Sequence, residues 1–260
     1  ASLAGFIETL RGHAREDVGA RDRFLGIMQV QAERMAQLID DLMSLSRIEL
    51  NEHVAPAGAV DLTGAVMDVV DAVGPMARRR GVAIDMHLPP RGEAVVVGDR
   101  DQILQVVQNL VDNALKYSPD EGAVVVAVEL DQTVDAATAP RRSSSARLSL
   151  LTPDHAQGRY AVLRVTDSGV GIAREHLPRL TERFYRVEGQ KSGERMGTGL
   201  GLAIVKHIVN RHRGGLAVES VEGEGTTFTA YFPRPANSGA EGSPSTGDQG
   251  GSPDVVMEVS

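Results

Sequence analysis

Strand and helix patterns alternate along most of this chain, and their order limits the fold more than any other feature. The spacing of apolar residues predicts helices at residues 63–79, 99–117 and 200–212. Short β-branched runs predict strands at residues 82–88, 94–97, 123–130 and 160–166, with a closing hairpin at 216–220 and 226–232. We therefore expect an α+β domain, an α/β sandwich with a mixed sheet and its amphipathic helices stacked on one face.

Residues 1–53 follow a different pattern, that of a helical hairpin. Leu3, Phe6, Ile7 and Leu10 share one face of the first helix, and Gly12 and Gly19 are expected to bracket a polar turn. The second helix has the alternating 4-3 spacing of a coiled-coil seam, at Phe24, Met28, Gln31, Met35, Leu38, Leu42 and Leu45. Two helices alone bury little surface, so we expect two chains to pair into a four-helix bundle. The alternative is a hairpin packed on its own second domain.

The remaining boundaries follow from composition. Residues 54–58 are small and include a proline, which suits a linker to a second domain at 54–234. Residues 131–158 interrupt the strand pattern and are expected to form a long inserted loop between neighbouring strands. Residues 235–260 are acidic and rich in Gly, Ser and Pro, and we expect this tail to be disordered.

Charge and cysteine content exclude several functional classes. The net charge of -8, with a pI near 5.4, argues against nucleic acid as the main partner. The chain has no cysteine, so disulfides and cysteine-ligated metals are excluded. No apolar run approaches the roughly 20 residues of a membrane span. The first residue is Ala1 and no signal-peptide pattern follows, so we expect the chain to begin inside a longer polypeptide.

The first motif with chemical potential lies on the predicted helix 99–117. Asp99 and Gln102 form a capping-box pattern at its start. Four polar residues project from one side of it, at i, i+4, i+7 and i+8: Asn109, Asn113, Lys116 and Tyr117. Amide oxygens can ligate a hard cation, and the ammonium suits phosphate, so the motif is typical of a phosphate-and-metal site. The alternative is a solvated polar face.

The second motif is Asp167-Ser-Gly169-Val-Gly171-Ile172, directly after an apolar strand. A carboxylate at a strand end can accept a hydrogen bond from an exocyclic amino group such as that of adenine. The glycines allow the backbone to approach a flat ring closely. The alternative is an ordinary turn.

The third motif is a glycine-rich loop that leads into a helix, Gly197-Thr198-Gly199-Leu200-Gly201-Leu202. The free N–H groups at a helix N-terminus bind phosphate. A Rossmann fingerprint would directly follow a strand, but residues 173–196 are polar and charged, so that interpretation is disfavoured.

The order of these motifs, with Phe184-Tyr185-Arg186 between the second and the third, resembles a known family. It is similar to the histidine-kinase branch of the ATP-binding (Bergerat-type) fold shared with gyrase, the Hsp90 chaperone and MutL-type repair ATPases. Glu33-Arg34-Met35 and Asp41-Leu-Met-Ser-Leu-Ser-Arg-Ile-Glu49 look like the second helix of the kinase dimerisation domain. The resemblance covers residues 1–234 and looks closest to phosphate-regulon sensor kinases.

The resemblance implies a two-component sensor kinase that transfers the γ-phosphoryl group of ATP to a histidine. Asn113 would ligate Mg²⁺, with Asn109 nearby. Lys116 and Arg186 would meet the phosphates, so that Asn109, Lys116 and Arg186 would assist the transfer. Tyr117 would pack near the adenine.

It also implies roles for the two glycine motifs. Asp167 would hydrogen-bond the adenine amino group, assisted by Gly169, Gly171 and Ile172. The loop Gly197-Thr198-Gly199-Leu200-Gly201-Leu202 would form the phosphate-side hinge of a mobile lid spanning residues 173–198. Thr227 would sit beside the base.

The resemblance places the phosphate-accepting histidine just upstream of Ala1. None of the seven histidines has the family's acceptor context, so we expect the chain to bind ATP or ADP without phosphorylating itself. The implied partners are a second copy of the chain and a response-regulator receiver domain. The implied location is the cytoplasmic portion of an inner-membrane sensor, with no membrane contact by this segment.

Two other functions fit the motifs. One is a nucleotide-responsive binding module that transfers nothing. The other is a serine kinase or repair ATPase of the same fold, which the N-terminal hairpin disfavours because those proteins do not need it.

Overall fold

The computed structural model describes residues 3–12, 17–51, 53–139, 145–153, 159–187 and 197–235. The helices are α1 (Leu3–Arg11), α2 (Val18–Leu50), α3 (Leu62–Arg79), α4 (Arg100–Tyr117), α5 (Val134–Thr138), the 3-10 helix η1 (Arg174–Arg179) and α6 (Gly201–Arg211). The strands are β1 (Ala59–Asp61), β2 (Ala83–His87), β3 (Val95–Val97), β4 (Ala123–Gln132), β5 (Ala146–Leu151), β6 (Tyr160–Asp167), β7 (Gly215–Val221) and β8 (Gly225–Pro233). All the tail beyond Pro235 lies outside the described residues. No helix within the described ranges is both long and apolar enough to cross a membrane.

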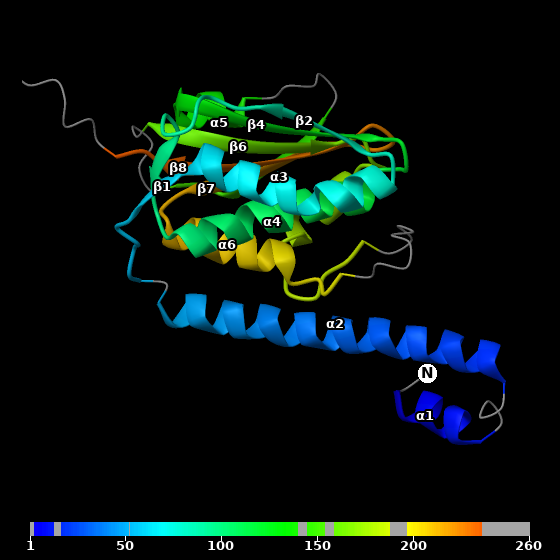
Figure 1. The fold of residues 1–260 in the computed structure, drawn as a ribbon. Coiled ribbons are helices and arrows are strands. Elements are labelled where there is room, and N and C mark those ends of the chain that lie inside the picture. Colours follow the sequence, from blue (N-terminus) through cyan, green and yellow to red (C-terminus); the bar gives the residue numbers. More distant parts are fainter. Residues whose placement is uncertain are drawn as a thin grey trace, which may run out of the picture.

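The predicted mixed sheet is confirmed. Six strands form it in the order β2-β4-β6-β8-β7-β5, where β2 and β4 are parallel and all other neighbours are antiparallel. Helices α3, α4 and α6 pack on one face of it, while the long α2 lies beyond them (Figure 1). The predicted strand at 94–97 is present as β3, but it pairs with β1 in a separate two-stranded sheet.

Helix α4 shows how the fold presents polar groups beside a buried core. Its apolar residues recur every three or four positions, and Ile103, Val106 and Leu110 are completely buried. The predicted polar residues of the same helix lie beside this buried face and are only partly buried. The core fixes the direction in which this polar side of α4 points.

The start of α4 is capped differently from the predicted capping box. Asp99 Oδ1 accepts hydrogen bonds from the backbone N–H groups of Asp101 and Gln102, as expected. Gln102 does not reach back, however. The N–H of Asp99 instead donates to Nε2 of His212, 3.0 Å away at the end of α6. Because Nε2 accepts, Nδ1 carries the proton and donates to the carbonyl of Ile208, at 2.8 Å. Burial lowers the pKa of His212, so this neutral ring joins the two helices.

The segment 131–158 is not the simple loop that the sequence predicts. Strand β5 within it pairs with β7 at the sheet edge, and α5 lies on the face opposite the other helices (Figure 1). There the largely buried Arg164 donates to the carbonyl of Ala137, at 3.0 Å, and to Glu129 Oε1, at 3.1 Å. The interruption does fall between neighbouring strands, because β4 and β6 are paired.

Helix α2 begins earlier than predicted. Asp17 caps it by accepting from the N–H of Ala20, which places Gly19 inside the helix and not at the end of a turn. Its C-terminal half packs on the α/β domain, where Leu45 and Ile48 are buried. To this extent the alternative, a hairpin packed on its own domain, is correct.

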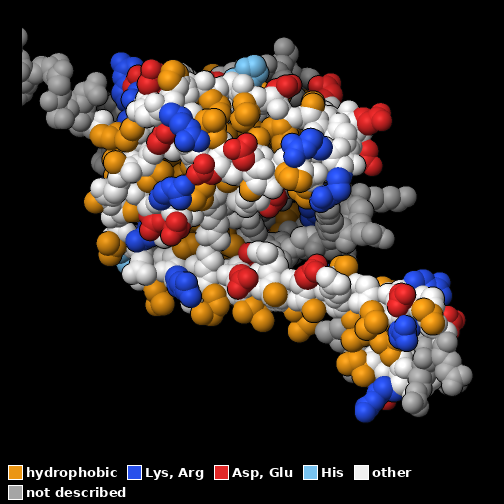
Figure 2. Space-filling model, in the orientation of Figure 1, with side chains coloured by type: hydrophobic (Ala, Val, Ile, Leu, Met, Phe, Trp, Pro, Cys, Tyr) orange, Lys and Arg blue, Asp and Glu red, His pale blue; other side chains and the backbone are white. Residues whose placement is uncertain are grey.

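The residues of the predicted α2 seam therefore do not share one environment, because some face the α/β domain and others face solvent. Leu45 is buried against the α/β domain and Leu38 packs against the same core, whereas Met35 and Leu42 are exposed. Figure 2 shows a row of exposed apolar side chains along the outer edge of α2. The large exposed apolar residues of its middle section are Leu25, Ile27, Val30, Met35, Ile39, Leu42 and Met43.

Candidate functional site

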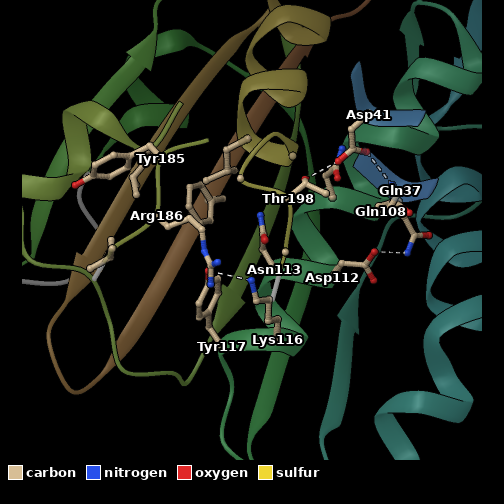
Figure 3. Close-up of a pocket in the computed structure, with 18 of the residues that line it drawn as sticks. Gln37, Asp41, Gln108, Asp112, Asn113, Lys116, Tyr117, Tyr185, Arg186 and Thr198 are labelled. Carbon is tan, nitrogen blue, oxygen red and sulfur yellow. Dashed lines mark hydrogen bonds between the residues drawn. The ribbon is translucent and has the colours of Figure 1, made fainter. Parts of the chain in front are cut away.

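One cavity of about 980 Å³ lies between α4, α2 and the glycine-rich loop. Figure 3 shows Asn113, Lys116, Tyr117 and Arg186 grouped on one side of it. Most of the residues singled out in the sequence line this cavity: Asn109, Asn113, Lys116, Tyr117, Asp167, Gly171, Ile172, Arg186, Gly197, Thr198, Gly199, Gly201 and Leu202. Three motifs that are far apart in the chain thus share one space.

Three of the residues singled out do not line the cavity. Leu200 is completely buried in the core. Gly169 lies beside the carbonyl of Tyr117, and its N–H donates to Asp167. The hydroxyl of Thr227 pairs with that of Thr166, at 2.9 Å, because alternate side chains of β8 point to opposite faces of the sheet. Its neighbours Thr226 and Phe228 line the cavity instead. Nucleotide contacts of the three residues stay predictions.

Asp167 stands at the end of β6 and is 6% exposed. Its Oδ1 accepts hydrogen bonds from the backbone N–H of Gly169, at 2.8 Å, and of Thr226, at 3.2 Å. These two donors fix the orientation of the carboxylate. The following loop is closely packed, because a Cβ on Gly171 would lie 2.0 Å from the carbonyl oxygen of Val221. With φ at +68°, this position requires glycine.

The polar side of α4 lies directly against the glycine-rich loop. A Cβ on Gly197 would lie 2.9 Å from Lys116 Nζ, and one on Gly201 would lie 3.0 Å from Asn109 Oδ1. Glycine at both positions therefore lets an ammonium and an amide reach the backbone of the loop. Lys116 Nζ also donates to the hydroxyl of Tyr117, at 3.3 Å.

Lys116 lies near two other cations of the cavity lining, Arg186 and Arg34. Burial, together with the guanidinium groups of Arg186 and Arg34, lowers the pKa of Lys116 from 10.5 to about 8. Burial also raises the pKa of Tyr117, against the opposing effect of Arg186. A bound polyanion would offset the repulsion among the cations and would favour the charged form of Lys116.

The sequence does not identify α2 as a wall of this cavity. Its lining residues are Val30, Gln31, Glu33, Arg34, Gln37 and Asp41. Asp41 is 6% exposed and accepts from the hydroxyl of Thr198, at 2.6 Å, and from Gln37 Nε2, at 2.8 Å (Figure 3). The sequence signal for this wall is a polar stripe, since Arg34, Gln37 and Asp41 share one side of the helix that also carries the apolar seam.

The predicted lid, residues 173–198, begins with a packed segment. Leu177 of η1 and the following Leu180 belong to the main core, so this first part is anchored to the domain. Further along, the N–H of Phe184 donates to the carbonyl of Gly199, at 2.9 Å. Residues 188–196 lie outside the described residues, and the mobility of the lid stays a prediction.

Comparison with known proteins gives consistent matches. The family model described as "Histidine kinase-, DNA gyrase B-, and HSP90-like ATPase" matches residues 98–236. The phosphate regulon sensor protein PhoR of Pseudomonas aeruginosa is 35% identical over 231 residues, which cover 88% of this chain and 46% of that protein. The chain thus spans about half the length, or less, of the curated relatives it matches.

Solved structures of histidine kinases are also similar to this chain. The mycobacterial sensor histidine kinase MprB is similar with a TM-score of 0.52 and 28% identity, covering 69% of this chain and 100% of that one. The histidine kinase ThkA, solved in complex with the response regulator protein TrrA, is similar in fold with a TM-score of 0.64 and 19% identity, covering 90% of this chain and 57% of that one. The family match covers more than half of the chain and includes all three motifs. The chain therefore belongs to the histidine kinase-, DNA gyrase B- and HSP90-like ATPase family, in its sensor histidine kinase branch.

Proposed function

We propose that this chain is the ATP-binding catalytic core of a two-component sensor histidine kinase. The core transfers the γ-phosphoryl group of ATP to a histidine, from which it passes to an aspartate of a response regulator. The observation that carries the proposal is the single cavity shared by the polar side of α4, Asp167 and the glycine-rich loop. The names of the relatives support it, and the complex of ThkA with TrrA supports a receiver domain as partner.

The cavity offers two chemically different kinds of group. Asp167 provides a fixed carboxylate that suits the amino group of adenine. Lys116 and Arg186 provide positive charge that suits the phosphates. Phosphoryl transfer depends mainly on positioning and on neutralising the charge of the transferred group. In this scheme Asn109, which lies against Gly201, holds the loop beside the phosphates.

A magnesium ion fits the residues of α4. Asn113 lines the cavity with an amide oxygen, and Asn109 offers a second one close by. The described residues contain no cluster of three or more acidic, His or Cys side chains that could hold a metal alone. This suits Mg²⁺, which keeps several waters and is held by one or two protein ligands together with substrate phosphates. When bound, the ion would neutralise phosphate charge.

We further propose that the working unit is a homodimer formed through residues 1–53 and located on the cytoplasmic side of a membrane-anchored sensor. The exposed apolar residues of α2 support pairing, because a row of this length is unfavourable in water. The family's acceptor helix would complete the four-helix bundle.

The test of the function is transfer to a supplied acceptor. We expect γ-labelled ATP to put acid-labile label on a chain lengthened upstream to include the family's acceptor motif, and none on residues 1–260 alone. The reason is that none of the seven histidines of residues 1–260 has the sequence context of the family's acceptor, which must lie in line with the γ-phosphate. Label would be measured after acid and alkali treatment, which separates phosphohistidine from phosphoserine.

The alternatives give other results in the same assay. A lengthened chain that binds ATP but stays unlabelled would favour a nucleotide-responsive binding module. Acid-stable label on an added protein substrate would favour a serine kinase. Stoichiometric acid-labile label on residues 1–260 would contradict the upstream acceptor.

ATP affinity should depend on pH through Lys116. Its pKa of about 8 in the empty cavity means that the ammonium loses its proton as pH rises through this value. The triphosphate binds the charged form better, so affinity falls as pH rises above 8, by at most about tenfold per pH unit. Calorimetry from pH 7 to 9 measures this.

Lys116→Arg is the matched control for this pH dependence, because arginine stays charged throughout the range. Its ATP affinity should change little between pH 7 and 9. A parallel fall in wild type and Lys116→Arg would assign the pH dependence to another group.

A further inference from the structure

Helix α2 forms one side of the cavity and is held there by several contacts. Thr198 in the glycine-rich loop donates to Asp41, and Ser44 Oγ donates to Gln105 Oε1 of α4, at 2.9 Å. Near its end, Glu49 forms an ion pair with Arg183. The side chains of α2 that face the cavity are therefore part of the site, although they come from the N-terminal hairpin.

Arg34 is the cation that α2 contributes to this side. It lines the cavity, and its Nε is buried with no hydrogen-bond partner among the described residues. It is close enough to Lys116 for its charge to lower the pKa of that ammonium. A guanidinium keeps its charge, and a buried donor without an acceptor is costly. An anionic ligand in the cavity would supply the missing acceptor.

The acidic residues nearby already have neutral donors. Three carboxylates that line the cavity accept from glutamine amides, Glu33 from Gln29 at 3.0 Å, Asp41 from Gln37 at 2.8 Å and Asp112 from Gln108 at 2.9 Å. These bonds orient the carboxylates along their own helices, α2 and α4. The cations of the cavity, in contrast, come from three different elements, because Arg34 lies on α2, Lys116 on α4 and Arg186 on the segment after η1.

From these contacts we propose that Arg34 is a third phosphate-binding residue, so that a nucleoside polyphosphate is held between α2 and the α/β domain and not by that domain alone. The proposal rests on the proposed function, because it assumes that the cavity takes a nucleotide. The planar guanidinium can donate two parallel hydrogen bonds to phosphate oxygens. Nucleotide binding would then draw α2 and the α/β domain together.

The test is calorimetric titration of the full chain at pH 7 with ATP and with adenosine, which lacks phosphate. We expect Arg34→Gln to weaken ATP binding by about five- to tenfold and to leave adenosine binding within about twofold of wild type. Arg34→Lys, which keeps the charge without the planar fork, should fall in between. The matched control is Arg47→Gln, which removes the same charge from an exposed position of α2 outside the cavity and should bind ATP like wild type.

A structural role for Arg34 would give a different result. Equal losses for ATP and adenosine, or equal ATP affinity of Arg34→Gln and wild type, would overturn the proposal. A second measurement is the salt dependence of ATP affinity, which should become weaker in Arg34→Gln because one charge contact is lost. If wild type and Arg47→Gln bind no ATP, the nucleotide site itself fails, and Arg34 with it. Circular dichroism of each variant confirms that the helices remain.

Discussion

Replacing Asp167 with Asn is expected to weaken ATP binding by roughly 10- to 100-fold, or about 1.4 to 2.7 kcal/mol. The amide oxygen of the variant can still accept from Gly169 and Thr226, which now hold Oδ1 of the carboxylate. The other oxygen becomes an NH₂ group, which cannot accept a hydrogen bond from the amino group of adenine. Calorimetry with ATP measures the loss, and thermal unfolding checks that the variant remains folded.

Two comparisons make this result specific to the base. Asp85→Asn removes the same charge from an exposed position of β2 and should bind ATP like wild type. Inosine triphosphate has a carbonyl in place of the amino group, so Asp167→Asn should bind it at least as well as wild type does. Equal affinity of wild type and Asp167→Asn for ATP would remove Asp167 from the base-binding site.

Placing two acidic residues on the exposed side of α2 is expected to convert a dimer into a monomer. Ile39 is 58% exposed and Leu42 is 45% exposed, so their replacement by Asp leaves the core of the single chain intact. In a dimer these positions would be buried, where unpaired charges are strongly unfavourable. Light scattering at micromolar concentration should therefore give the dimer mass for wild type and the monomer mass for the double variant.

The choice of positions matters because some apolar residues of α2 pack against the α/β domain and others are exposed to solvent. Leu38 packs against the core of the α/β domain, so an Asp there would also disturb the cavity wall. Arg47→Asp on the exposed polar flank is a control that adds an acidic side chain outside the apolar row, and it should remain dimeric. A monomeric wild type would end the dimer proposal.

The sequence predicts the α4 side of the site well because the relevant signals are local. A helix with apolar residues every three or four positions has only one polar side, so Asn109, Asn113 and Lys116 had to point the same way. The glycine at Gly171 is likewise explained locally, by a backbone conformation that other residues avoid. Their meeting in one cavity depends on the order of the strands in the sheet, which the alternating patterns did not predict.

The α2 wall and the inserted strand could not be predicted in the same way. The polar residues Gln37 and Asp41 gain their meaning only from Thr198, which is far away in the chain. Leu148 and Leu150 of β5 do alternate with polar residues, but six residues in a segment rich in Ser and Arg give a weak strand signal. Thr227 lies outside the cavity lining for a simpler reason, since a strand reverses its faces with every residue and its neighbours Thr226 and Phe228 line the cavity instead.

The inserted strand also affects the order in which the sheet can form. Strand β5 is encoded between β4 and β6, yet its partner is β7, with Ala146 opposite Ser220. During synthesis from the N-terminus, β5 therefore appears well before the strand that it pairs with. Pairing over such a separation is slow, and an unpaired edge can join the wrong partner in the meantime. Completion of the sheet must wait for the β7–β8 hairpin, so truncation before this hairpin would leave β5 without a place in the fold.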